Sequence, residues 1–353
     1  MTTLNALSFL EAATCVASWR RPLLVTHEKP DGDALGSLVA LRALLRSQGM
    51  QPRALLYDPI PARYELFHRF SSFPVLGRDF HSSELDACDA VIVLDTCAYT
   101  QLRPIADWLR AAPQPKLAVD HHTTRDDLAD FTLVDEGAAA TCVIIYDWAL
   151  GAKWAIDRNI AEALFVGMAT DTGWFRHANT DHRVLAAAAD LVAQGVRSHE
   201  LYEALFLRES AARVRLQGAA IASLELLAAD RAALMILSRG ALADAGATVA
   251  DTEDIVNEPL RIASVLVSVL LVEHDDGVVR ASFRSKPPLE SPGGSTREAA
   301  ADIDVAALAQ SFGGGGHRRA SGARIPGALS DVRRGIVESI VERIARKPGL
   351  DPR

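Results

Sequence analysis

Short apolar runs alternate with helix-like stretches along the first half of the chain. The apolar runs lie in PLLVTH (22–27), RALLYD (53–58), AVIVLDT (90–96) and KLAVDHH (116–122), and the helical pattern ALGSLVALRALLRSQG (34–49) follows the first of them. Strands that alternate with helices indicate βαβ units and a parallel sheet. The sequence therefore predicts a doubly wound α/β domain over residues 1–180, with ligands binding beyond the carboxyl ends of its strands.

A different pattern begins near residue 181. The stretches TDHRVLAAAADLVAQG and ESAARVRLQGAAIASLELLAAD are rich in Ala and Leu at helical spacing, which predicts a helical linker over 181–229. Strand-like runs return in AALMILSR, IASVLVSVLLVEH and VVRASFRSK, and a turn at Asp275, Asp276 and Gly277 joins the last two as a hairpin. We therefore expect a second, smaller α/β domain over 230–345, which includes a Pro/Gly/Ser-rich loop at 287–300.

Composition narrows the possible partners. The formal net charge of −8 gives no global basic field, so long duplex DNA is not expected as a partner. The four cysteines form no C-x-x-C pair, which favours free thiols in a reducing compartment. The N-terminal SFLEAATCVASW carries a capping box of Ser8 and Glu11 rather than a signal-peptide pattern, and no run is long enough to span a membrane. We therefore expect a cytoplasmic protein.

Side chains of metal-binding types follow three predicted strands and one apolar helical run. They are His27, Asp31 and Asp33; Asp95; Asp120, His121 and His122; and Asp171. Taken singly, an aspartate after a strand is usually a turn or cap residue, and a His-His pair is more often exposed than ligating. Parallel strands bring their carboxyl ends to one edge, so the conjunction of these segments favours a metal centre.

The ligand types restrict the metal. Carboxylate oxygen and imidazole nitrogen without thiolate suit Mn²⁺, Mg²⁺ or Fe²⁺ better than structural zinc. The set is too large for one ion. Two divalent ions about 3.5 to 4 Å apart, bridged by a carboxylate and a water, would use it and would support hydrolysis of a phosphate ester.

The segments HEKPDGDALGS, VLDT, DHH and ATDTGWF together resemble the DHH phosphoesterase superfamily, and RASFRSK and FGGGGHRRASG resemble its DHHA1 domain. This combination is similar to the NrnA-type oligoribonuclease and phosphoadenosine phosphate phosphatase branch. The resemblance implies a two-metal enzyme, with Mn²⁺ as the expected ion, that hydrolyses short oligoribonucleotides, 3′-phosphoadenosine 5′-phosphate (pAp) and, in some members, linear or cyclic dinucleotides. It is also compatible with a homodimer.

The resemblance also implies roles for individual residues. One ion would be held by His27, Asp31 and Asp95, and the other by Asp33, Asp95, His121 and Asp171, so that Asp95 is the bridge. The catalytic pair would be His122, which faces the substrate phosphate, and Asp120, which orients the neighbouring imidazoles.

Basic and glycine-rich segments of the second domain are the expected substrate grip. Glycine runs are most often flexible loops or helix stops, but glycines also let backbone N–H groups approach an anion, and the family pattern favours binding. The expected contacts are Arg284, Ser285 and Lys286, Gly314, Gly315 and Gly316, His317 and Arg318, together with Arg176 after the metal motif. Arg319 adds a further charged donor, and His177 lies beside Arg176.

The sequence departs from the family pattern in two places. The 287–300 loop is longer than usual, and Cys142 stands where an acidic residue is commoner.

The sequence leaves three alternative functions open. They are an inorganic pyrophosphatase, a single-strand DNA exonuclease of the same superfamily and a non-catalytic nucleotide sensor. GGGGH and RASFRSK argue against the first, the acidic charge against the second, and the full ligand set against the third.

Overall fold

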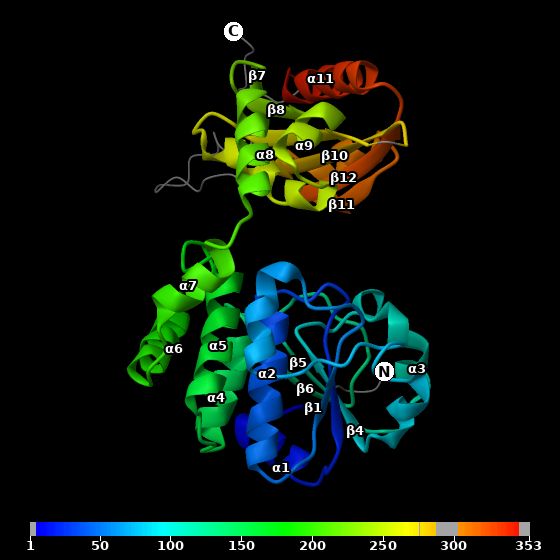
Figure 1. Cartoon of the computed structure of the whole chain (residues 1–353). Helices are drawn as coiled ribbons and strands as arrows, with labels where there is room; N and C mark the ends of the chain where they lie inside the picture. The colour runs from blue at the N-terminus through cyan, green and yellow to red at the C-terminus, as the bar shows by residue number, and fades with distance from the viewer. Residues whose placement is uncertain (1–4, 275, 287–302, 346–353) are drawn as a thin grey trace. The chain divides into compact units, whose positions relative to one another are not determined.

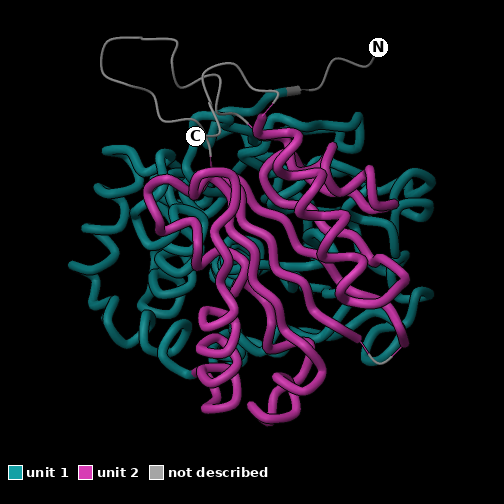
Figure 2. The backbone as a smooth tube through the Cα atoms, turned by 90° about the horizontal axis from the view of Figure 1, so that it is seen from above, with its two compact units in different colours: residues 1–208 teal, residues 209–353 magenta. Residues whose placement is uncertain are grey.

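The computed structural model describes residues 5–274, 276–286 and 303–345. The chain forms two compact units, residues 1–208 and 209–353, which Figure 2 colours separately. The predicted loop at 287–300 lies outside the described residues.

The sheet of the first unit has six parallel strands in the order β1-β6-β5-β4-β2-β3. These are β1 (Asn5–Ala6), β2 (Pro22–Val25), β3 (Arg53–Leu55), β4 (Ala90–Leu94), β5 (Lys116–Asp120) and β6 (Phe131–Val134). The expected doubly wound α/β fold is confirmed, and its central strands coincide with the apolar runs. Strands β1 and β6 were not among the predicted ones.

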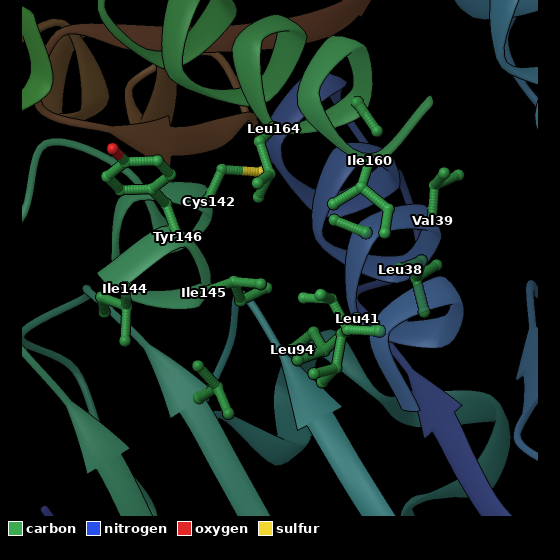
Figure 3. Packing of buried hydrophobic residues seen from close by; sticks show 14 of the residues in the cluster. Leu38, Val39, Leu41, Leu94, Cys142, Ile144, Ile145, Tyr146, Ile160 and Leu164 are labelled. Carbon is green, nitrogen blue, oxygen red and sulfur yellow. The ribbon is translucent and has the colours of Figure 1, made fainter. Parts of the chain in front are cut away.

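Helices cover both faces of this sheet (Figure 1). On one face lie α1 (Phe9–Val16), α2 (Gly32–Ser47) and α4 (Thr141–Gly151), and α5 (Arg158–Asp171) and α6 (His182–Ala193) join the same core by packing against these helices. On the other face lie η2 (Ser82–Ala87), η4 (Arg103–Ile105) and α3 (Ala106–Ala111). Neighbours on one strand therefore face opposite cores, Leu24 with α2 and Leu23 with the second layer. Figure 3 shows side chains of α2, α4 and α5 meeting above the strands, with the Cys142 thiol beside Leu164.

The segment predicted as a linker is divided between the two units. Helices α6 and α7 (Ser198–Phe206) bury Leu191 and Leu201 in the first unit's core. Helix α8 (Ala211–Ala222) instead buries Leu216 and Ala220 in a core of the second unit. The amphipathic pattern is helical throughout, and only the partners of its apolar faces assign the helices to one unit or the other.

The second unit has a mixed sheet in the order β11-β12-β10-β9-β8-β7. Its elements are β7 (Glu225–Leu227), β8 (Ala232–Leu237), α9 (Arg239–Ala245), η5 (Val249–Thr252), η6 (Ile255–Arg261), β9 (Val267–Glu273), β10 (Val278–Ser285), α10 (Val305–Gln310), β11 (Gly315–His317), β12 (Ala320–Pro326) and α11 (Leu329–Ala345). Strands β9 and β10 pair antiparallel, as the hairpin prediction requires. This is the smaller α/β domain that the sequence predicts. Across the described residues, no helix is long and apolar enough to cross a membrane.

Candidate metal centre

The carboxyl ends of the first sheet bring the predicted ligands together. His27 follows β2, Asp31 caps the start of α2, and Asp33 lies in the first turn of that helix. Asp95 follows β4 with a left-handed backbone (φ 60°), a conformation that aspartate tolerates better than most residues. Asp171 is the last residue of α5. Elements separated along the sequence therefore converge at one sheet edge, as expected for parallel strands.

The ligand atoms form two groups around Asp95. His27 Nε2 lies 3.6 Å from Asp95 Oδ2, and His121 Nε2 lies 3.6 Å from both Asp95 Oδ1 and Asp171 Oδ2. One set whose ligand atoms all lie within 4.8 Å of one another contains His27, Asp31 and Asp95. A second such set contains Asp33, His121 and Asp171. These distances give room for an ion in each set, with Asp95 contacting residues of both.

The electrostatics of the cluster fit divalent cations. Burial, together with the charge of Asp31, raises the pKa of Asp33 to about 6. Burial and the charge of Asp33 raise the pKa of Asp171 to about 7 and hold that of Asp95 well above its ordinary value. Buried carboxylates so close together repel one another unless a cation or proton intervenes. A bound cation would offset this repulsion.

The histidines of the cluster are also prepared as ligands. The His121 Nδ1 lies 3.2 Å from the Ala138 carbonyl oxygen, to which an Nδ1–H group donates. In this tautomer Nε2 keeps a lone pair that can bind a metal. That Nε2 is buried and has no hydrogen-bond partner within the described part of the chain. Burial lowers the pKa of His27, which favours the neutral imidazole that metals bind.

Asp33 is held in place by the start of helix α4. Its Oδ2 accepts a hydrogen bond from the Thr141 backbone N–H (2.6 Å), and its Oδ1 accepts one from Cys142 N–H (2.9 Å). Free amides at a helix N-terminus favour a carboxylate there. The close approach depends on Gly167, because a Cβ there would lie 2.2 Å from the Cys142 Sγ and 2.7 Å from Asp33 Oδ1. The helices therefore fix this carboxylate rigidly.

Cys142, noted above as a departure from the family pattern, lies in the layer directly behind Asp33. Its thiol is buried, 3.4 Å from the Ser37 hydroxyl, in space left by Gly36 and Gly167. An acidic side chain here would place another negative charge beside Asp33. The cysteine fills the space without adding charge.

Thr141 contacts two of the predicted ligands and was not among the residues that the sequence predicted. Its buried hydroxyl donates a 2.9 Å hydrogen bond to Asp95 Oδ1, while its backbone N–H holds Asp33. One residue thus orients carboxylates from two different elements. A threonine beginning a helix is too common to reveal such a role in a single sequence.

His122 and Asp120 form a hydrogen-bonded pair beside the ligands. The His122 Nδ1–H donates to Asp120 Oδ1 at 2.7 Å, and the same oxygen accepts the backbone N–H groups of His121 and His122. This bond with Asp120 raises the pKa of His122. Burial raises the pKa of Asp120, but its hydrogen bond and charge interaction with His122 outweigh burial and leave that pKa lowered. His122 also lies close enough to Asp95 and His121 to share an ion with them.

Arg176 and His177 follow a turn with left-handed backbone at Gly173, Trp174 and Phe175. Arg176 is exposed, and its Nε donates to the Gly173 carbonyl at 2.7 Å. The His177 ring packs over Gly173, where a Cβ would lie 2.2 Å from its Nε2. Their described contacts therefore belong to this turn and not to the metal-binding sets.

In the second unit, a groove of about 700 Å³ is lined by Arg284 and Gly314 of the predicted contacts. It is also lined by Arg280 and Arg324, which sequence reasoning missed. Arg280 and Arg324 are directly opposite each other on β10 and β12, and alternation along β10 places Arg284 on the same face as Arg280. Like charges directly across strands are unfavourable, and Arg324 offsets its charge by pairing with Asp276 at 2.8 Å. Arg280 and Arg284 are therefore the arginines of this face that best suit an anionic ligand. The period-2 pattern of RASFR was the available signal for Arg280.

Other predicted contacts make bonds within the unit. The Ser285 hydroxyl donates to the Ile303 carbonyl (2.8 Å), and Lys286 Nζ donates to the Ile262 carbonyl (2.6 Å). The Arg318 carbonyl accepts from Val305 N–H, which ties the chain after the glycine run to α10. Arg319 donates to the Lys286 carbonyl at 2.9 Å. The side chains of Ser285 and Lys286 thus connect segments of the fold and do not line the groove.

The glycine run has a structural reason in two places. A Cβ at Gly314 would lie 2.1 Å from the Gly322 carbonyl oxygen, and Gly316 has a φ of +135° against the backbone of Ser321. Both glycines let strand β11 approach β12 closely. Gly315 and His317 are exposed on this edge strand, Gly315 with open space around it.

Comparison with known proteins agrees with this architecture. Residues 22–168 match the N-terminal domain of the DHH family, and residues 232–346 match the DHHA1 domain. A crystal structure of an exopolyphosphatase-related protein from Bacteroides fragilis superposes with a TM-score of 0.82 at 23% identity, covering 97% of this chain and 98% of that chain. This likeness shows the shared fold.

Two curated relatives match most of the chain. The bifunctional oligoribonuclease and PAP phosphatase NrnA of Bacillus subtilis is 28% identical over 307 residues, covering 86% of this chain and 88% of the relative. The protein of the same name from Thermus thermophilus is 29% identical over 335 residues, covering 92% of this chain and 90% of the relative. Both matches therefore span both units.

Proposed function

The chain belongs to the DHH family and carries a DHHA1 domain, and we propose that it is a metal-dependent phosphoesterase with two related activities. It hydrolyses short oligoribonucleotides and dinucleotides such as pApA to mononucleotides, and it converts pAp to AMP. The named activities of the two NrnA relatives, which match the chain along nearly its whole length, support this choice of substrates.

The observation that carries the proposal is the pair of three-residue ligand sets at the edge of the first sheet. We assign His27, Asp31 and Asp95 to one ion and Asp33, His121 and Asp171 to the other, with Asp95 shared. When bound, two such ions acidify a water molecule and neutralise charge on the phosphoryl oxygens. Oxygen and nitrogen ligands support Mn²⁺ as the resident ion, with Mg²⁺ or Fe²⁺ as substitutes.

The surrounding side chains supply position and charge. Asp120 accepts the Nδ1 proton of His122, so the other ring nitrogen is available to donate to a phosphate oxygen. The raised pKa of His122 favours the protonated imidazole that such donation needs. Thr141 keeps Asp95 oriented through its hydroxyl, which makes Thr141 a positioning residue.

We assign nucleotide phosphates to the groove of the second unit. Arg280, Arg284 and Arg324 offer guanidinium donors there, and the small residues Gly313 and Gly314 leave its wall open. A few local arginines on an acidic chain suit short substrates that present few phosphates. The four free cysteines support a cytoplasmic location.

A substrate panel tests the proposal. The protein is incubated with Mn²⁺ and, separately, pApA, pAp, a cyclic dinucleotide, pyrophosphate or a longer single-stranded DNA. Release of AMP from pApA and pAp, absent from Asp95→Asn protein, is the expected result. Hydrolysis of pyrophosphate or long DNA alone would identify one of the alternative enzymes, and binding of nucleotides without turnover would identify a sensor.

A further inference from the structure

A separate pocket of about 380 Å³ lies at the other end of the first unit's sheet. Its walls include Arg21, just before β2, and Arg53, the first residue of β3, whereas the metal-binding residues follow the carboxyl ends of their strands. The volume falls within the roughly 300–1,000 Å³ range of small-molecule sites. None of the metal-binding or groove residues described above lines it.

The pocket carries an excess of positive charge. Four arginines line it, Arg21, Arg42, Arg46 and Arg53, against one carboxylate, Glu84. Glu84 pairs with Arg53 at 3.0 Å, and no carboxylate of the described residues lies within ion-pair distance of the other three arginines. Such a surplus is unexpected on a chain of net charge −8.

Two of these arginines are held close together on one helix. Arg42 and Arg46 are four residues apart on α2, so their side chains share a helix face, where like charges repel. Arg42 donates to the Ser71 hydroxyl and, at 3.0 Å, to the Ser72 carbonyl, while its buried Nε–H has no partner in the described part of the chain. An anion in the pocket would relieve the repulsion.

Most of the remaining lining is apolar, and one residue of it is aromatic; Gln51 is the polar exception. The Arg53 guanidinium lies 4.1 Å from the centroid of the buried Phe80 ring, and Leu23, Met50 and Pro52 complete the apolar wall. A stacked guanidinium with apolar surroundings suits a flat ring, whereas the unpaired arginines suit a phosphate. The arginines and the apolar wall together therefore fit a ligand that carries both a phosphate and a flat ring.

We propose that this pocket is a second ligand site, which binds a small organic phosphate with a flat ring, of the size and chemistry of a nucleoside monophosphate. The phosphate lies among Arg21, Arg42 and Arg46, and the ring lies along the Arg53 and Phe80 side. The site is independent of hydrolysis and takes its ligand whichever substrate the metal centre acts on.

Hydrogen exchange with 5′-AMP as the probe locates the site without altering the protein. In full-length metal-free protein, millimolar AMP should slow amide exchange in residues 46–53 and 80–88. Adenosine, which lacks the phosphate, should leave these segments unchanged. Absence of protection by AMP would overturn the proposal, and equal protection by inorganic phosphate alone would overturn the assignment of a flat ring.

Arginine variants then test the contacts. In Arg46→Ala and in Arg21→Ala, the AMP concentration that gives half-maximal protection should rise by about tenfold or more, since each change removes a charge-assisted contact. Both side chains are exposed, so the fold should persist, and hydrolysis of pApA without added AMP should be unchanged. Arg110→Ala, at an exposed arginine of α3 paired with Asp107, is the matched control. Protection that is the same in Arg46→Ala, Arg21→Ala and the control would overturn the proposal.

Discussion

The carboxylates of the first unit and the arginines of the second are held in different ways. Asp33 and Asp95 are 1% and 2% exposed, and backbone amides or a hydroxyl fix their oxygens. Arg284 is half-buried in an open groove, and the one described hydrogen bond of its side chain goes to the Phe283 carbonyl. The first region specifies positions of atoms, whereas the second supplies charge that a ligand can approach in more than one way.

This difference predicts unequal tolerance to substitution. In the buried cluster, even a change that preserves shape should remove function, because the ligand set depends on each charge and orientation. In the groove, a change that preserves charge should retain part of the function. The following experiments test this contrast.

Asp95→Asn should give the largest effect. The variant keeps the shape and the left-handed backbone but removes the shared charge, so kcat for pApA should fall by about 1,000-fold or more. The melting temperature of metal-free protein should stay the same or rise, since a buried charge is lost. Asp107→Asn, at an exposed carboxylate, is the control for both assays. Substantial turnover by Asp95→Asn would contradict the assignment of a shared ligand.

Metal-free protein should lose stability as the pH rises. Asp33 and Asp171 have pKa values of about 6 and 7, above the roughly 3.9 of an unfolded chain, so the folded state binds their protons more tightly. Between pH 5 and 8 the free energy of unfolding should therefore fall, by about 1 to 1.5 kcal/mol for Asp33 alone. Urea unfolding in EDTA measures this, and added Mn²⁺ should reverse the loss. A stability that rises over this range without metal would contradict the picture of crowded carboxylates.

Thr141→Val should reduce kcat/KM by about 10- to 100-fold, because Asp95 loses its hydroxyl partner while the Thr141 backbone N–H remains. Thr141→Ser retains the hydroxyl and should recover most of the activity. Titration of Mn²⁺ against both variants shows whether the loss lies in metal affinity. Equal loss in the serine and valine variants would point to packing and not to the hydrogen bond.

Arg284→Ala should give the smallest change in the chemical step. We expect KM to rise about tenfold, with kcat within about twofold, because a phosphate contact is lost away from the metal ligands. The KM of Arg284→Lys should lie between those of the unchanged protein and Arg284→Ala, whereas at Asp95 even a change that preserves shape should remove function. Arg261→Ala, at an exposed arginine paired with Glu258, is the control. A large fall in kcat with unchanged KM would end the distinction between the two regions.

The parts of the site that the sequence predicts are those carried by residue type. Aspartates and histidines after apolar runs indicate a cluster because parallel strands bring their ends together. Contacts made by backbone groups have no such signature: the Cys142 N–H and the Ala138 carbonyl act at the site whatever their side chains are. The alternation along β10 could have indicated Arg280, but the position of Arg324 beside it depends on the pairing of β12 with β10, which single-strand patterns do not specify.

The pairing of strands also explains why the sequence alone does not show what the glycine run does in the fold. Gly314 and Gly316 were expected as ligand contacts, because glycines let backbone N–H groups approach an anion and the family pattern favours binding. The close approach of β11 to β12 gives both a packing reason that becomes visible only with the strand register. Gly314 also lines the groove together with Arg284, so these two keep their expected role as candidate contacts.

The bond between Asp33 and the start of α4 joins residues 108 positions apart in the chain. A fragment ending after β5 would contain nearly every proposed ligand, yet it would lack the amides that orient Asp33 and would lack Asp171 as well. In a refolding experiment, high-affinity Mn²⁺ binding should therefore appear only when α4 and α5 dock against α2, later than the secondary structure itself. The rate of Mn²⁺ uptake would then report the rate of that late docking step.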